Sequence, residues 1–305
     1  MKYLKLIFVL LFLNSCISED IHFRNINQSE ISICLVKDGQ LDRFTTEADL
    51  ESLALEKEPW VKPSEIRFYD WSSHIFYLNV EKEKEKHSGR FFVVKSDQQP
   101  LFLGMFFPLF WSSIPQFPSV IAHDDFFYPI DVVGLGGYGF SESTSLNNNH
   151  EFRLALEKSG LLKEGIHVVL TGLNRVNQTT VSYTYRVTNL DTENIYILDP
   201  DKMGASRFHY YTNGVSLMQG SIYYPAENFS STPSEKIEST WYFKLAPGKS
   251  VTRTVQLEGF RQIPSGTVKA IFYFPGAPLK KGEWQKSDGR VWLGSFKAEN
   301  EFSLR

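Results

Sequence analysis

The sequence predicts a mainly β protein with some α structure, in which an N-terminal α+β domain precedes an antiparallel β-sandwich. Aromatic residues make up 15% of the 305 residues, and this bias favours strands because ring side chains pack well on a pleated sheet. From residue 165 onward, short apolar runs alternate with turn residues, as in a sandwich. The length is typical of two domains, which we place at residues 30–160 and 161–305.

The first sixteen residues, MKYLKLIFVLLFLNSC, have the composition of an export signal. Lys2 and Lys5 supply positive charge before an unbroken apolar run, Leu6–Leu13. This run is much shorter than the roughly 20 residues that a membrane-spanning helix needs. The sequence therefore predicts a signal peptide over residues 1–15.

The end of this segment, Leu13-Asn14-Ser15-Cys16, resembles the lipobox of bacterial lipoproteins. The resemblance implies that Cys16 is acylated, with fatty acids such as palmitate, and begins a tether over residues 16–29. Each buried methylene contributes about 0.8 kcal/mol, so two or three acyl chains would hold the protein firmly at a membrane. Ile17, not Asp, follows the cysteine, which favours the outer membrane of the cell envelope and leaves its periplasmic and surface faces both open.

The expected partners are therefore the membrane, through the lipid, and other envelope proteins. The formal net charge of −3 at pH 7 gives no basic field, so nucleic acid is not expected as a partner. The chain has 2 cysteines. Because Cys16 carries lipid in this interpretation, Cys34 is expected to be a small buried apolar side chain.

Two helices are expected in the first domain. One covers residues 45–58, TTEADLESLALEKE, where leucines give an apolar face. The other covers residues 150–159, begins after the capping residue Asn149, buries Leu154 and Leu156, and stops at the following glycine. The strands expected around them are ISICLVK, EIRFYDWSSHIFYLNV with a kink near residues 70–73, RFFVV and PLFLGMFF.

The second domain is expected to consist of short strands between turns: HVVLTGL, VSYTYRVTN, IYILD, RFHYY, STWYFKL, SVTRTVQLEGF, TVKAIFYF and VWLGSF. The order TYRVTNLDTENIYIL, LAPGKSVTRTVQL, IPSGTVKAIFYF resembles the immunoglobulin-like domains of bacterial envelope proteins. It is also similar to the small bacterial intracellular proteinase inhibitors. These resemblances imply an immunoglobulin-like antiparallel β-sandwich, and the second adds proteinase inhibition as an alternative function.

Two glycine-containing patterns imitate nucleotide-binding loops. GLGGYG, at residues 134–139, fits G-x-G-x-x-G, but the following FSESTS is a poor helix former, and a dinucleotide loop must open a helix. APGKS, at residues 246–250, lacks the first glycine of a P-loop and precedes a strand. We therefore expect no cofactor, and we expect the glycines of GLGGYG to allow a bend or close packing.

The remaining candidate residues fall into three groups. His123, Asp124 and Asp125 are weak candidates for a metal site, because three ligands seldom come from one short segment. Asp70 could orient His74 as a general base in YDWSSH, which gives an extracytoplasmic hydrolase as an alternative function. Aromatic and histidine side chains that could form a binding surface are Trp71, His74, Phe107 and Trp111.

G-x-S-x-G and H-E-x-x-H, two common hydrolase motifs, are absent from the sequence. We therefore expect no catalytic residue. The sequence favours a lipid-anchored envelope protein with a non-catalytic binding or structural role, and it leaves the hydrolase and inhibitor alternatives open.

Overall fold

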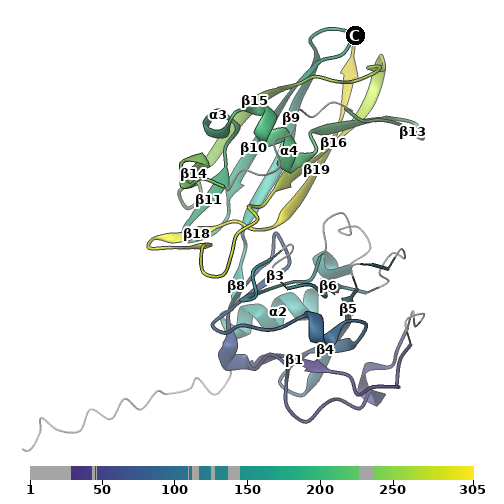
Figure 1. Ribbon diagram of the computed structural model, residues 1–305, viewed down its shortest axis with the longest axis vertical. Helices are drawn as coiled ribbons and strands as arrows, with labels where there is room; N and C mark the ends of the chain where they lie inside the picture. Colours follow the sequence, from purple (N-terminus) through teal and green to yellow (C-terminus); the bar gives the residue numbers. More distant parts are fainter. Residues whose placement is uncertain are drawn as a thin grey trace, which may run out of the picture.

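The computed structural model describes residues 29–42, 45, 47–108, 110–111, 117–124, 128–136, 145–226 and 237–305. Cys16 and residues 17–28 of its expected tether lie outside this part of the chain. The described residues form two stacked lobes, with the N-terminal lobe below the C-terminal lobe in Figure 1. Both lobes consist mostly of strands with a few short helices, so the predicted mainly β fold with some α is confirmed.

The N-terminal lobe contains two four-stranded sheets. In order, the first contains β1 (Ile31–Leu35), β4 (Phe91–Ser96), β5 (Gln99–Phe107) and β6 (Ser119–Ile121). The second contains β7 (Val132–Gly134), β3 (Ile75–Leu78), β2 (Ile66–Asp70) and β8 (Leu162–Lys163). Apolar side chains from both sheets and from helix α2 (His150–Ser159) form one core.

Local sequence signals account for several of these elements. The predicted kink at residues 70–73 is a hairpin turn between β2 and β3. Helix α2 begins where the Asn149 side chain accepts a hydrogen bond from the Phe152 amide at 2.9 Å, and it ends at Gly160 with φ 70°. The predicted burial of Leu154 is wrong, because this side chain is 49% exposed. Phe152, Ala155 and Leu156 form the buried face instead.

The predicted helix over residues 45–58 is also wrong. The described part of this segment contains one 3-10 turn, Leu50–Ser52, and then runs beside strand β1. The Glu56 amide donates to the Leu35 carbonyl at 2.9 Å, and the Lys37 amide donates to the Ala54 carbonyl at 2.9 Å. These backbone bonds outside the segment replace helical ones, so tertiary pairing overrides helix propensity.

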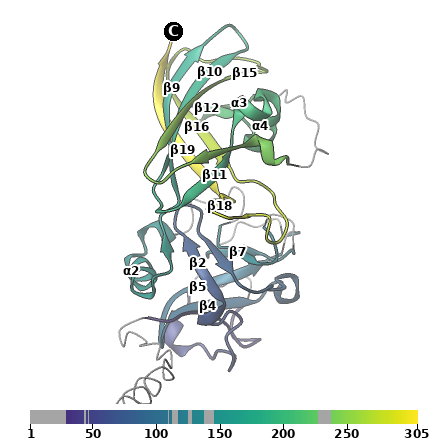
Figure 2. The same cartoon turned by 90° about the vertical axis from the view of Figure 1, so that its left-hand side faces the viewer.

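The C-terminal lobe contains three sheets in a sandwich-like arrangement. The first sheet contains, in order, β15 (Ser250–Leu257), β10 (Val181–Asn189) and β9 (Ile166–Arg175). The second contains β13 (Ile222–Tyr224), β12 (Val215–Gln219), β16 (Gly266–Pro275) and β19 (Ser295–Leu304). The third contains β14 (Tyr242–Leu245), β11 (Asn194–Leu198), β18 (Gly289–Val291) and β17 (Gln285–Lys286). Helices α3 (Pro200–Met203) and α4 (Ala205–Thr212) lie at the side of the sandwich (Figure 2). Further 3-10 turns in the two lobes are Pro63–Glu65, Glu85–His87, Ser145–Asn148 and Ser239–Trp241.

Two strand predictions in this lobe need correction. RFHYY lies in helix α4, because Phe208 and Thr212 bury one face at a spacing of four residues. VWLGSF is not one strand, since β18 ends at Val291 and β19 begins at Ser295. The interruption contains Gly294, where an added Cβ would lie 2.1 Å from the Ser73 Cβ of the other lobe. Close contact between the lobes thus requires glycine at this position.

A continuous hydrophobic core joins the two lobes. Phe68 and Tyr77 of the N-terminal lobe belong to the same cluster of buried side chains as Trp284 and Trp292 of the C-terminal lobe. The Trp284 ring contacts Tyr77 edge to face, with ring centroids 4.7 Å apart. Its indole nitrogen also donates to Asp131 at 3.0 Å. Within the described residues, no helix is both long and apolar enough to cross a membrane.

Candidate ligand-binding pocket

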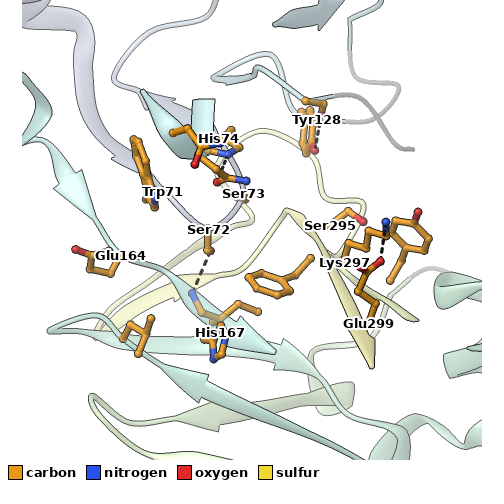
Figure 3. A pocket seen from close by; sticks show the side chains of 17 residues that line it. Trp71, Ser72, Ser73, His74, Tyr128, Glu164, His167, Ser295, Lys297 and Glu299 are labelled. Atoms are coloured by element: carbon orange, nitrogen blue, oxygen red, sulfur yellow. Dashed lines mark hydrogen bonds and ion pairs between the residues drawn. The ribbon is translucent and has the colours of Figure 1, made fainter. Parts of the chain in front are cut away.

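A pocket of about 630 Å³ lies at the junction of the two lobes. The N-terminal lobe contributes the β2–β3 turn with Trp71 and His74, and the C-terminal lobe contributes β9 and β19. Figure 3 shows His74 and Trp71 on one side of this space, with His167 and Lys297 across from them. The volume is within the range of about 300–1,000 Å³ that is typical of small-molecule sites.

The β2–β3 turn has a fixed backbone conformation. One carboxylate oxygen of Asp70 accepts hydrogen bonds from the Ser72 hydroxyl at 2.7 Å and the Ser73 amide at 3.1 Å. This pattern, in which an Asp side chain bonds to groups two and three residues on, is common in tight turns. His74 has φ 54°, a left-handed conformation that is unusual for a residue other than glycine and often marks functional positions. The turn therefore holds Trp71 and His74 at the pocket.

Both ring nitrogens of His74 take part in hydrogen bonds. Its Nε2 lies 2.8 Å from the Asn147 Oδ1 and its Nδ1 lies 2.9 Å from the Tyr69 hydroxyl. An amide oxygen only accepts, so Nε2 donates to Asn147 and Nδ1 accepts from Tyr69. Burial lowers the pKa of His74 to about 4, although the bond to Asn147 opposes this shift. The imidazole is therefore uncharged at neutral pH.

Trp71 is half-buried, and its surroundings fix the orientation of its ring. The guanidinium of Arg153, on helix α2, lies 5.1 Å from the centroid of the indole ring, close enough for a cation–π interaction. Arg153 also forms an ion pair with Glu164, which lines the pocket. The Trp71 ring is thus held from the side of α2, and its exposed part borders the cavity.

Strand β19 supplies most of the opposite wall. Phe296 is half-buried, and its ring meets His167 of β9 edge to face, with centroids 5.7 Å apart. Lys297 pairs with Tyr273 of β16 in the register of the sheet. Lys297 and Glu299 form an ion pair of 3.0 Å. Because side chains alternate along a strand, Lys297 and Glu299 lie on the same face of β19.

A buried charge cluster holds the two walls together. The Nη2 of Arg290, on β18, forms an ion pair of 2.6 Å with Asp70. The Nη1 of the same guanidinium forms ion pairs with Asp191 and Glu193. The Arg290 side chain is 1% exposed and that of Asp70 is 0% exposed. Burial would lower the pKa of Arg290, but Asp70 and Asp191 outweigh it and raise this pKa above its usual value. The guanidinium therefore stays charged and compensates the buried carboxylates.

Ser72 forms a second link between the lobes. Its hydroxyl oxygen accepts hydrogen bonds from the Ile166 amide and from the Trp292 indole nitrogen, each at 3.0 Å. The Cβ of an alanine at Gly165 would lie 2.0 Å from this oxygen and 2.4 Å from the Asp70 Oδ1. Glycine at residue 165 therefore lets the chain cross between the lobes at close range.

The structure separates the four residues that the sequence analysis grouped as a binding surface. Trp71 and His74 line the interlobe pocket. Phe107 is only 3% exposed and belongs to another cluster in the N-terminal lobe, where its ring meets Trp111 edge to face at 5.6 Å. Phe107 and Trp111 therefore lie apart from Trp71 and His74. Asp70 also does not bond to His74 as suggested: its carboxylate bonds to Arg290, Ser72 and Ser73, and the His74 ring bonds to Tyr69 and Asn147.

The weak metal candidates have other local roles. The Asp124 carboxylate accepts a hydrogen bond from the Lys84 amide at 2.7 Å, and the His123 Nδ1 lies 3.0 Å from the Asp124 carbonyl. Asp125 lies outside the described residues. Within the part of the chain that is described, no group of three or more His, Cys, Asp or Glu side chains is placed to hold a metal ion.

The structure also shows the surroundings of Cys34 and of the first glycines of GLGGYG. Cys34 is 6% exposed in strand β1, as expected for a small buried side chain. In GLGGYG, Gly134 ends β7, and an added Cβ would lie 2.3 Å from the Tyr128 ring. This contact explains glycine there through close packing. Gly136 borders the interlobe pocket, whereas residues 137–139 lie outside the described part.

Sequence reasoning missed most of the pocket. Asn147, Glu164, His167, Phe296 and Lys297 come from three separate stretches of the chain, and each resembles an ordinary surface residue in its own stretch. The aromatic residue in SFKAENEF is the one local signal that could have indicated a member of this set. Their convergence depends on how the lobes pack, which local pattern does not encode.

Comparisons with known proteins add little to this description. No protein family profile matches the chain, and no curated protein matches it. Among solved structures, one similar chain is a β-glucosidase from Kluyveromyces marxianus in complex with glucose. The identity is 12%, the TM-score is 0.19, and the match covers 46% of this chain and 15% of that one. A similarity this small carries no argument about fold or activity.

Proposed function

We propose that this protein is a lipid-anchored component of the bacterial cell envelope that binds a small ligand between its two lobes without converting it chemically. The observation that supports this most strongly is the composition of the pocket. Side chains from both lobes line it, and buried ion pairs and hydrogen bonds join the two walls. A site with walls fixed in advance loses little conformational entropy when its ligand binds.

The hydrogen bonding of the pocket favours binding over hydrolysis. A general base needs a nitrogen that can take a proton, but in His74 one nitrogen donates to Asn147 and the other accepts from Tyr69. Asp70, the carboxylate that the hydrolase alternative requires beside His74, is paired with Arg290. The two residues thus have positioning roles in this proposal.

The binding role can be tested with tryptophan variants. Protein purified from its native envelope is extracted, and the retained small molecules are identified by mass spectrometry. We expect retention by the wild type and by Trp111→Ala, and loss of at least fivefold in Trp71→Ala. Trp111 is a matched control, because it is also a half-buried tryptophan but lies outside the pocket. Equal retention by all three proteins, or by none, would contradict the proposal, and turnover of the retained compound would favour the hydrolase alternative.

The anchor has a separate test. Cys16→Ser removes the only thiol that the lipobox resemblance assigns to acylation. We expect the variant to lose labelling by a palmitate analogue and to leave the membrane fraction. The control is Cys34→Ser, which changes a buried cysteine and should leave labelling intact. Continued labelling of Cys16→Ser would show that the lipid assignment is wrong.

A further inference from the structure

We propose that the ligand of the interlobe pocket is an uncharged carbohydrate, such as a short neutral oligosaccharide. This inference rests on the proposed function, since it assigns a chemical class to the ligand of the same pocket. Three properties of the lining residues support it: aromatic rings on both walls, charges that are already paired, and neutral groups that can both donate and accept hydrogen bonds.

Aromatic residues line the cavity from both lobes. Trp71 comes from the N-terminal lobe, and Phe296 and Tyr273 come from the C-terminal lobe. The face of an aromatic ring carries negative charge density and attracts slightly positive C–H groups. One face of a sugar ring consists largely of such C–H groups, whereas its hydroxyls project from the edge. Aromatic side chains from both lobes therefore suit a ligand that has an apolar face and a polar rim.

The charged side chains at the pocket have partners within the protein. Glu164 is paired with Arg153, and Lys297 is paired with Glu299. Glu299 also forms an ion pair of 2.8 Å with Lys269. A charged ligand would have to compete with these pairs or leave one of them with excess charge. An uncharged ligand avoids that cost, because it leaves each pair intact.

Neutral polar groups complete the lining. The amides of Asn147 and Asn148 are exposed at the pocket, and the hydroxyl of Ser295 lies on the opposite wall. Amide and hydroxyl groups offer both donors and acceptors, as sugar hydroxyls do. His74 supports this set without offering a nitrogen to the ligand, because its Nε2 donates to Asn147 and its Nδ1 accepts from Tyr69. Figure 3 shows the N-terminal and C-terminal members of the lining facing each other.

Binding to an oligosaccharide array tests the proposal. The lipidated protein is kept in a detergent that contains no sugar, and it is probed with neutral di- to hexasaccharides, with uronic and sulfated oligosaccharides, and with peptides. We expect binding to neutral saccharides, and a loss of at least fivefold in affinity for Trp71→Ala and for Phe296→Leu. The leucine keeps apolar volume at residue 296, so its loss of affinity reports the ring and not the fold. Tyr223→Ala is the control, since Tyr223 is 55% exposed on β13 outside the pocket.

The outcomes distinguish the two proposals. If acidic saccharides or peptides bind, neutral ones do not, and Trp71→Ala weakens that binding, the carbohydrate inference fails while the binding function stands. If no class binds to the wild type, both proposals fail. If neutral saccharides bind equally to the wild type and to both pocket variants, the carbohydrate site is not this pocket, and the inference is overturned.

Discussion

Arg290 and Asp70 lie 220 residues apart in the chain, yet they form an ion pair of 2.6 Å in the buried junction between the lobes. Asp70 at the same time organises the turn that carries Trp71 and His74, through its bonds to Ser72 and Ser73. One carboxylate therefore joins the lobes and shapes the pocket. The stability of the junction and the geometry of the pocket should depend on the same few residues.

Replacement of Arg290 by methionine tests the charge cluster. Arg290→Met leaves Asp70 and Asp191 buried without a positive partner, so we expect the free energy of unfolding to fall by about 3–5 kcal/mol. Urea unfolding measures this loss. Arg186→Met is the control, because Arg186 is exposed on β10 and should change stability by about 0.5 kcal/mol or less. A loss below about 1 kcal/mol for Arg290→Met would contradict the assigned role.

The hydroxyl of Ser72 can be tested by a double-mutant cycle. Ser72→Ala leaves the Ile166 amide and the Trp292 indole without the acceptor that they share, and we expect a loss of about 2–3 kcal/mol. Trp292→Phe removes one of these donors. The double variant should therefore lose less stability than the sum of the two single variants. Strict additivity would show that the Ser72–Trp292 hydrogen bond does not contribute.

Alanine substitutions at two glycines with similar backbone conformations distinguish the cost of backbone strain from the cost of a steric clash. Gly165 has φ 77° and no room for a Cβ, whereas Gly248 has φ 65° and no atom within 4 Å of an added Cβ. Gly248→Ala should cost about 1–2 kcal/mol through its left-handed conformation alone. Gly165→Ala should cost about 1–3 kcal/mol more, because it overpacks the junction against Ser72 and Asp70. Equal losses in thermal unfolding experiments would argue against tight packing at residue 165.

Acid should destabilise the protein through two histidines. Burial lowers the pKa of both His74 and His209 from 6.5 to about 4. Between these values the unfolded chain binds more protons than the folded one, so the free energy of unfolding falls as the pH falls from 6.5 to 4. Each histidine contributes on the order of 3 kcal/mol to this loss.

Histidine variants separate the loss of stability that His74 and His209 cause in acid from the loss that protonation of carboxyl groups causes. His74→Gln and His209→Leu each remove one titrating group, and urea unfolding from pH 7 to pH 4 should show a shallower loss of stability for each variant than for the wild type. Lys and Arg do not titrate in this range, and the carboxyl groups are common to all three proteins. Curves of the same slope would show that these histidines do not have lowered pKa values.

Local pattern predicted the parts of the fold that local contacts determine. Strands β4 and β5 and the two ends of α2 were expected, and they depend on residues close in sequence, such as Asp97 in the turn between these strands with φ 54° and Asn149 at the cap. The helix expected at residues 45–58 failed because this segment bonds to β1 and to the residues next to it. The strand predicted for RFHYY is a helix, because Phe208 and Thr212 bury the same helical face, although the segment also has strong β propensity.

Only a small part of the pocket could be predicted from the sequence. Trp71 and His74 could be selected from YDWSSH, since they lie between two apolar runs. Lys297 and Asn147 could not, because their position depends on Arg290 meeting Asp70 and on the glycines that let the lobes approach. A contact between residues 220 positions apart leaves no local signal in a single sequence.

The central claim is that a ligand binds between the lobes, and hydrogen–deuterium exchange tests it most directly. The protein is compared with and without a small-molecule extract of its native envelope, with Trp71→Ala measured in parallel. We predict slower exchange in the wild type at residues 71–74, 147–148, 166–167 and 295–297, in both lobes at once, and no such protection in the variant. Protection confined to one lobe or to other segments, or no protection at all, would contradict the account.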